Sequence, residues 1–121
     1  MKIWLADLTY TQQSIASDVV PAGIGMIAEY TEKKIPNIDK IKLFKFPETL
    51  SENLNLYTPD LIGFSNYIWN SSLTDIYLKR IKEVNPNIIT VVGGPNFPTA
   101  KDEQKDYLEK RPYIDFYIIK E

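Results

Sequence analysis

Small and polar residues follow two apolar stretches of strand length, and their positions are the first sign of chemistry in this chain. The stretch 61–65 ends in Ser65, and the stretch 88–93 ends in the pair Gly93-Gly94. An apolar run that stops abruptly in such residues is typical of a buried parallel strand whose carboxyl end opens onto a ligand crevice. The chemistry indicated is therefore ligand binding at the ends of two strands.

Three bulky residues, Tyr67, Ile68 and Trp69, come directly after the first of these strands. They could fill a core, but at a strand end they would offer a flat apolar surface to a large planar ligand. The paired glycines, followed by Pro95, could form a simple turn, and they would also let the backbone approach a ligand closely. Together these features predict a broad, mostly uncharged slot rather than a phosphate cradle.

Two absences exclude most catalytic apparatus from these residues. With no Cys and no His, the chain has no disulfide, thiolate nucleophile, imidazole base, zinc site or iron–sulfur cluster of its own. A net charge of −2 offers no field for a polyanion, so nucleic-acid and anionic-membrane roles are disfavoured. No apolar stretch is long enough to span a bilayer, and the first residues do not form a signal peptide, so we expect a cytoplasmic protein.

Strand and helix patterns alternate along the chain and predict a single α/β domain over residues 1–121. The helices are expected from residue 21 to about 35, with Ile24, Ile27, Ala28 and Ile35 on one face, and at 47–57, 72–84 and 99–110; the strands are expected at 2–7, 40–43, 61–65, 88–93 and 114–119. The second strand alternates lysine with apolar residues, which is typical of an edge. A flavodoxin-like, three-layer parallel sheet with strand order 2-1-3-4-5 follows, with its crevice between strands one and three.

Crossover handedness predicts an unevenly covered sheet. In this order the first helix covers one face alone, and the other three helices cover the opposite face. The fifth helix that normally completes the first face has no counterpart before Glu121. We therefore expect either a fragment of a longer protein or a subunit that hides the uncovered face against a partner.

Other motifs of this fold class match poorly. Residues 23–28 fit the dinucleotide pattern G-x-G-x-x-A, but they follow a long loop, 8–20, instead of the first strand, and no acid ends the second strand. We interpret Gly23 and Gly25 instead as small residues that let a helix lie close to the sheet or to a ligand. A P-loop is absent, and a flavin-phosphate loop would need a glycine among residues 9–17. A receiver domain would need a second acid where Ser65 stands.

The residues described so far carry a resemblance. Ser65-x-Tyr67 followed by Gly93-Gly94 looks like the S-x-L…G-G pattern of cobalamin-binding domains, which are flavodoxin-like. The stretches 59–70, 91–95 and 113–121 more closely resemble the amino-terminal cobalamin (vitamin B12)-binding domain of radical S-adenosylmethionine (SAM) enzymes.

By this resemblance, the nucleotide tail of cobalamin would lie between the sheet and its flanking helices, and the corrin ring would lie across the strand ends. Thr9 replaces the histidine that ligates cobalt in related domains, so the resemblance implies no metal ligand from this chain. The cofactor-binding positions that it implies are Asp7, Thr9, Pro21, Gly23, Gly25, Ser65, Asn66, Tyr67, Ile68, Trp69, Gly93, Gly94, Pro95 and Asn96.

Radical SAM chemistry needs three cysteines around a [4Fe–4S] cluster, and this chain has none. The resemblance therefore implies that the cluster and S-adenosylmethionine belong to a carboxyl-terminal domain beyond Glu121. It also implies that residues 1–121 contain no catalytic residues. The leading hypothesis is a cobalamin-binding domain that positions the corrin for methyl transfer or radical chemistry performed by that partner domain. Self-association through the uncovered face is possible.

Two alternatives stay open. The first is a cobalamin-type fold that has lost its ligand and serves as an interaction or structural module, in which case Tyr67, Ile68 and Trp69 would fill the space beside Gly93-Gly94. The second is a small flavin or nucleotide carrier, although the phosphate-binding loop that it needs is not visible in the sequence.

Overall fold

A computed structural model describes residues 1–11 and 20–119 of the chain. In this part, strands and helices alternate as the sequence predicts. Their order is β1 (Ile3–Ala6), α1 (Ala22–Lys34), β2 (Lys42–Phe44), α2 (Pro47–Leu56), β3 (Leu61–Ser65), α3 (Ser71–Val84), β4 (Ile89–Gly93), α4 (Lys101–Glu109) and β5 (Phe116–Ile118).

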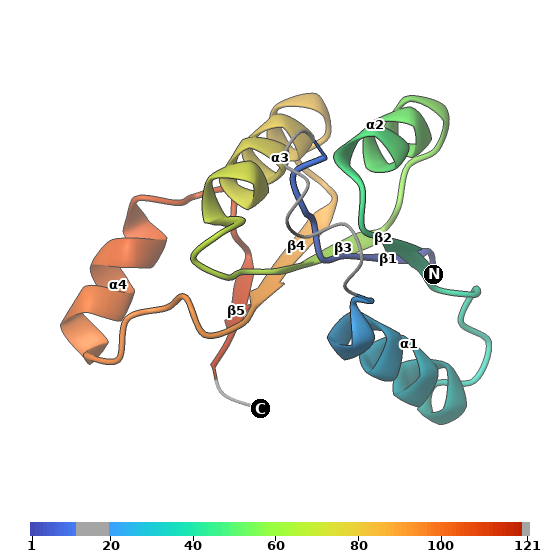
Figure 1. Ribbon diagram of the computed structural model, residues 1–121, viewed down its shortest axis with the longest axis horizontal. Coiled ribbons are helices and arrows are strands. Elements are labelled where there is room, and N and C mark those ends of the chain that lie inside the picture. Colours follow the sequence, from blue (N-terminus) through green and yellow to red (C-terminus); the bar gives the residue numbers. More distant parts are fainter. Residues whose placement is uncertain (12–19, 120–121) are drawn as a thin grey trace.

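The five strands form one parallel sheet in the order β2-β1-β3-β4-β5 (Figure 1). This order confirms the predicted flavodoxin-like topology, with β2 at one edge. The two outer strands are shorter than expected: β2 covers 42–44 instead of 40–43, and β5 covers 116–118 instead of 114–119. Each outer strand has only one neighbour to pair with, so its ladder ends sooner.

The main core lies between the sheet and α2, α3 and α4. In Figure 1, α2 and α3 lie above the sheet and α4 lies to its left. Leu50 of α2, Ile62 of β3 and Leu78 of α3 are fully buried there. Each such side chain stabilises the fold by roughly 1.5–3 kcal/mol relative to an exposed one. This layer fixes the sheet from one side and leaves the other side to α1.

The opposite face is covered by α1 alone among the described elements, as the handedness argument predicts (Figure 1). A small second core joins Ala28 of α1 to Ile3 and Ile41. Beyond it, Phe116 and Ile118 of β5 are 62% and 59% exposed. The β4–β5 half of this face is therefore bare in the described part of the chain.

The predicted apolar face of α1 is partly wrong. Ile24 and Ala28 are buried, but Ile27 is 56% exposed and Ile35 is 45% exposed. Because no neighbouring helix of the described part flanks α1, only the line of residues directly over the sheet is buried. The helical pattern was correct, but it indicated a wider contact than the sheet supplies.

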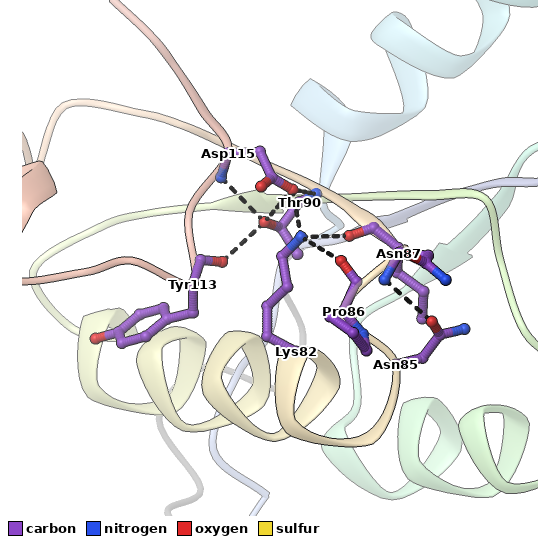
Figure 2. Close-up of polar contacts among 8 residues, drawn as sticks. Lys82, Asn85, Pro86, Asn87, Thr90, Tyr113 and Asp115 are labelled. Carbon is purple, nitrogen blue, oxygen red and sulfur yellow. Dashed lines mark hydrogen bonds and ion pairs between the residues drawn. The ribbon is translucent and has the colours of Figure 1, made fainter.

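A polar cluster holds β4 and β5 together at their amino ends (Figure 2). Asp115 Oδ2 accepts hydrogen bonds from Lys82 Nζ at 2.6 Å, from the Thr90 backbone N–H at 2.8 Å and from the Thr90 hydroxyl at 3.0 Å. Lys82 also donates to the carbonyls of Pro86 and Ile88, at 3.2 and 2.7 Å. These bonds tie the end of α3 to both strands and set their register.

Replacing Asp115 by Asn should lower the free energy of unfolding at pH 7 by about 1–3 kcal/mol, because Lys82 loses its ionic partner and a neutral amide oxygen accepts the bonds from Lys82 and the buried Thr90 more weakly. Burial alone would raise the pKa of Asp115, but hydrogen bonds from Lys82 and Thr90 outweigh it and hold the pKa below its usual range. Since the folded-state pKa is the lower one, this stabilisation is present above the unfolded-state pKa and is lost as the pH falls through the folded-state pKa.

Urea unfolding at pH 7 and at about pH 3 measures this effect, and the difference between D115N and the wild type should shrink at the acidic pH. The matched control is D106N, which breaks an exposed pair with Lys110. That change should cost less than about 1 kcal/mol. Equal losses in the two variants at pH 7 would contradict the assigned role of Asp115.

Candidate functional site

The carboxyl ends of β3 and β4 meet at one edge of the sheet, called the carboxyl edge below. Ser65 lies opposite Gly93 in the parallel ladder. The ladder continues past the strands, because the Asn66 N–H donates to the Gly93 carbonyl at 2.7 Å and the Asn96 N–H donates to the Asn66 carbonyl at 3.2 Å. The two loops that the sequence singled out are therefore in direct contact.

Gly94 is required by the conformation of this junction. Its φ is +120°, and a Cβ at this position would lie 2.5 Å from the carbonyl oxygen of Asn66. A side chain would be both strained and blocked by backbone. The sequence left both a simple turn and a close approach by a ligand open for the two glycines, and at Gly94 the conformation of the loop itself needs glycine.

Asn66 points into the protein. Its side chain is 2% exposed in total, and its Nδ2 lies 3.0 Å from the Asn96 carbonyl, 3.1 Å from the Tyr107 hydroxyl and 3.2 Å from the Tyr117 hydroxyl. Phe97 stacks on Tyr117, with ring centroids 3.9 Å apart. Asn66 and Asn96, both predicted to contact a cofactor, therefore bond to each other and hold the loops after β3 and β4 together. Pro95, in the loop after β4, is exposed.

Tyr67, Ile68 and Trp69 form an apolar platform at the carboxyl edge. The rings of Tyr67 and Trp69 are stacked in parallel, with centroids 4.4 Å apart and an interplanar angle of 6°. Ile68 is 80% exposed and Trp69 is 63% exposed. Ile68 and Trp69 are exposed and Tyr67 is partly buried. None of the three fills the space beside Gly93, where Ile118 is the one described residue with an atom within 4 Å of a Cβ.

A row of small residues, Gly63, Ser65 and Gly93, lies on the same face as α1. Gly63 and Ser65 share this face because side chains alternate along a strand, and Gly93 pairs with Ser65. A Cβ at Gly93 would meet no described atom closer than 4.0 Å, so the space above it is open. The row borders the bare apolar residues of β5 and could seat an elongated, uncharged group.

Gly63 is the member of this row that the sequence prediction missed. A glycine inside an apolar strand weakens the strand and often marks a close approach by a ligand or another chain segment. That signal was present in Leu-Ile-Gly-Phe-Ser, residues 61–65. Part of the explanation is packing, since a Cβ at Gly63 would lie 2.8 Å from Leu5 Cδ2, the end of a flexible side chain.

The loop after β1 contributes one acidic group. Asp7 is half-buried, its Oδ1 lies 3.5 Å from Asn70 Nδ2, and burial raises the pKa of its carboxyl group. Thr9 is 9% exposed, and its backbone N–H donates to the Lys45 carbonyl at 3.0 Å. Asp7 therefore lies half-buried at the carboxyl edge, whereas the backbone of Thr9 ties the loop after β1 to the end of β2. Residues 12–19 of the long predicted loop lie outside the described residues.

The start of α1 is open. Pro21 is the N-cap residue, and a Cβ at Gly23 or Gly25 would have no described atom within 4 Å. These glycines are not needed for close packing of the helix on the sheet, so that half of their sequence interpretation is wrong. No acidic residue lies in the first turn of α1. The helix start can therefore accept an anionic group without repulsion.

Other parts of the described chain offer less to a cofactor. A hollow of about 100 Å³ lies between α2 and α3, lined by Leu54, Tyr77 and Arg80 among others, near the amino ends of β3 and β4. Cofactor pockets are usually ~300 Å³ or more. Within residues 1–11 and 20–119, no three acidic side chains gather as a metal site, and no helix has the length and apolar character to cross a membrane.

Comparison with known proteins gives consistent matches. The profile of the B12 binding domain matches residues 11–121. The cobalamin-dependent radical SAM methyltransferase TokK of Streptomyces tokunonensis is 39% identical over 57 residues, which is 47% of this chain and 8% of TokK. The 2-(S-pantetheinyl)-carbapenam-3-carboxylate methyltransferase of Streptantibioticus cattleyicolor is 26% identical over 104 residues, which is 82% of this chain and 15% of that enzyme. The chain therefore spans a small part of the length of these relatives.

Replacing Gly94 by Ala should destabilise the fold by about 1–3 kcal/mol, because a Cβ there meets the Asn66 carbonyl in a strained conformation. The matched control is Gly25→Ala in α1, where a methyl group has space and alanine favours the helix by about 0.5–1 kcal/mol. Urea unfolding at neutral pH compares the two variants. A G94A variant as stable as the wild type would show that the loop does not need this conformation.

Proposed function

Because the chain belongs to the B12 binding domain family, we propose that it binds cobalamin at the carboxyl edge of the sheet. The observation that carries this proposal is the open position at Gly93, next to Ser65, on the face of the sheet that carries α1. A surface with small or absent side chains, next to the platform of large apolar side chains, suits a ligand with a narrow tail and a broad planar ring.

The tail would be held by the α1 side of the sheet. Gly93 lets it approach the backbone, and the Ser65 hydroxyl can donate or accept a hydrogen bond there. The start of α1 at Pro21, with no acid in its first turn, is suited to the phosphate of the tail. The glycine backbone and the Ser65 hydroxyl are neutral, and the start of α1 is positively polarised. This combination fits the tail of cobalamin, in which an anionic phosphate is linked to apolar and hydroxylated parts.

The corrin ring would rest on the apolar platform. Tyr67 and Trp69 present stacked aromatic surface, and Asp7 can accept hydrogen bonds from amide groups at the rim of the ring. Thr9 is buried and cannot replace the imidazole ligand of related domains. When bound, cobalamin supplies the cobalt–carbon chemistry used in methyl transfer, while this chain binds and orients it.

We further propose that the domain works with a carboxyl-terminal radical SAM domain. Two relatives with this sequence pattern carry methyltransferase names, and one is named as a radical SAM enzyme. The [4Fe–4S] cluster and S-adenosylmethionine would belong to that domain, in the reducing cytoplasm, where thiolate-bound clusters persist. The rest of the longer protein would then cover the bare β4–β5 face. The alternative is that a second copy of this chain covers it.

The alternative of a module that has lost its ligand has less support. It required Tyr67, Ile68 and Trp69 to close the space beside Gly93, and the described side chains leave this space open. The alternative of a flavin or nucleotide carrier still lacks the phosphate loop that it needs.

The direct test is to mix the purified chain with hydroxocobalamin and to follow the visible spectrum through gel filtration. We expect cobalamin to co-elute with the wild type. Replacing Gly93 by Val should weaken binding at least about tenfold, because the new side chain occupies the tail seat at a cost of ~1.4 kcal/mol or more. No retention by the wild type at micromolar protein would contradict binding by this domain.

The matched control is Ile89→Phe, which adds bulk to the same face and the same strand but at its amino end, where the side chain is already 40% exposed. This variant should retain cobalamin like the wild type. Urea unfolding of both variants verifies that the fold is intact, so that lost binding in G93V is not lost structure.

A further inference from the structure

We propose that Asn66 and Asn70 are positioning residues that fix the apolar platform before any ligand arrives. This inference rests on the proposed cobalamin function and adds a role for two side chains that do not face the ligand. The two asparagines enclose Tyr67, Ile68 and Trp69 in the sequence, and they are 2% and 0% exposed. The loop is thus buried at both ends and exposed in the middle.

Asn70 joins two loops of the carboxyl edge through a single amide group. Its Oδ1 accepts the backbone N–H of Tyr67 at 2.8 Å, and its Nδ2 donates to the Leu8 carbonyl at 3.1 Å. Its backbone N–H also donates to the Tyr67 carbonyl, at 3.2 Å. The amide therefore closes the platform loop on itself and fastens it to the loop after β1, which carries Asp7.

Asn66 fastens the other end. Its side chain lies within bonding distance of Asn96 in the loop after β4, Tyr107 on α4 and Tyr117 in β5. Buried amides with all their polar atoms bonded hold one arrangement strongly, since any shift leaves a polar group unpaired. The two clamps together leave the platform residues few alternative positions.

Fixing a binding loop in advance reduces the ordering entropy that binding costs. The stacked pair of Tyr67 and Trp69, with Trp69 exposed, is an apolar surface that would otherwise collapse inward against the sheet. The clamps keep this surface turned outward. We therefore assign Asn70 and Asn66 to positioning and the platform residues to contact.

The experiment compares Asn70→Ala with Asn85→Ala in the same chain. Asn85 also accepts a backbone N–H through Oδ1, from Asn87 at 3.1 Å, but at the amino end of the sheet. N70A removes both side-chain hydrogen bonds and should weaken the binding of hydroxocobalamin about tenfold, equivalent to ~1.4 kcal/mol. N85A should change it by less than about twofold. Should N70A fail to fold, Asn70→Ser keeps a polar N-cap residue for α3 but is too short to bridge the Tyr67 N–H and the Leu8 carbonyl.

A second readout needs no ligand. Iodide quenches the fluorescence of exposed tryptophan, so quenching reports the surroundings of Trp69. Trp4, at 2% exposed, is shielded from iodide. The quenching slope and the near-ultraviolet circular dichroism of the stacked rings should change in N70A and stay unchanged in N85A. If the wild type does not bind cobalamin, the proposed function fails and this readout alone decides the inference. Unchanged spectra and quenching in folded N70A or N70S would overturn it, as would unchanged affinity.

Discussion

The parallel pairing of β3 with β4 is the constraint on which the rest of this structure depends. It sets Ser65 opposite Gly93, and a shift by one residue would turn both to the opposite face of the sheet. At their amino ends the Ile89 N–H donates to the Asp60 carbonyl at 3.0 Å, and Asn66 extends the pairing past their carboxyl ends. The register is thus fixed at both ends, and the row of small residues lies on the α1 side as a result.

The uneven covering of the sheet gives its two faces different roles. The face under α2, α3 and α4 contains the main core and is closed, which makes the sheet rigid. The face under α1 is open along β4 and β5, where Phe116 and Ile118 are exposed (Figure 1). A rigid sheet with one open face can present backbone and small residues to a ligand without unfolding any part of its core.

Much of the fold followed from local patterns in the sequence. Apolar runs, helix ends and crossover handedness predicted the strand order and the uncovered face, since each depends on neighbouring residues or on chain direction. The roles of single polar side chains did not follow. Asn66 meets Tyr107 and Tyr117, which are 41 and 51 residues away, so nothing near it in sequence shows that it points inward. Asn70 was missed for the same reason, because its partner Leu8 is 62 residues away.

The central claim is that a ligand with a tail and a ring lies on the α1 side of the carboxyl edge. Backbone amide shifts of the ¹⁵N-labelled protein, followed while hydroxocobalamin is added, test this claim residue by residue. The account predicts that the largest shifts gather at Gly63, Ser65, Gly93 and the platform loop, with little change on α2 and α3. Shifts centred on the hollow between α2 and α3, or spread evenly over the surface, would contradict it.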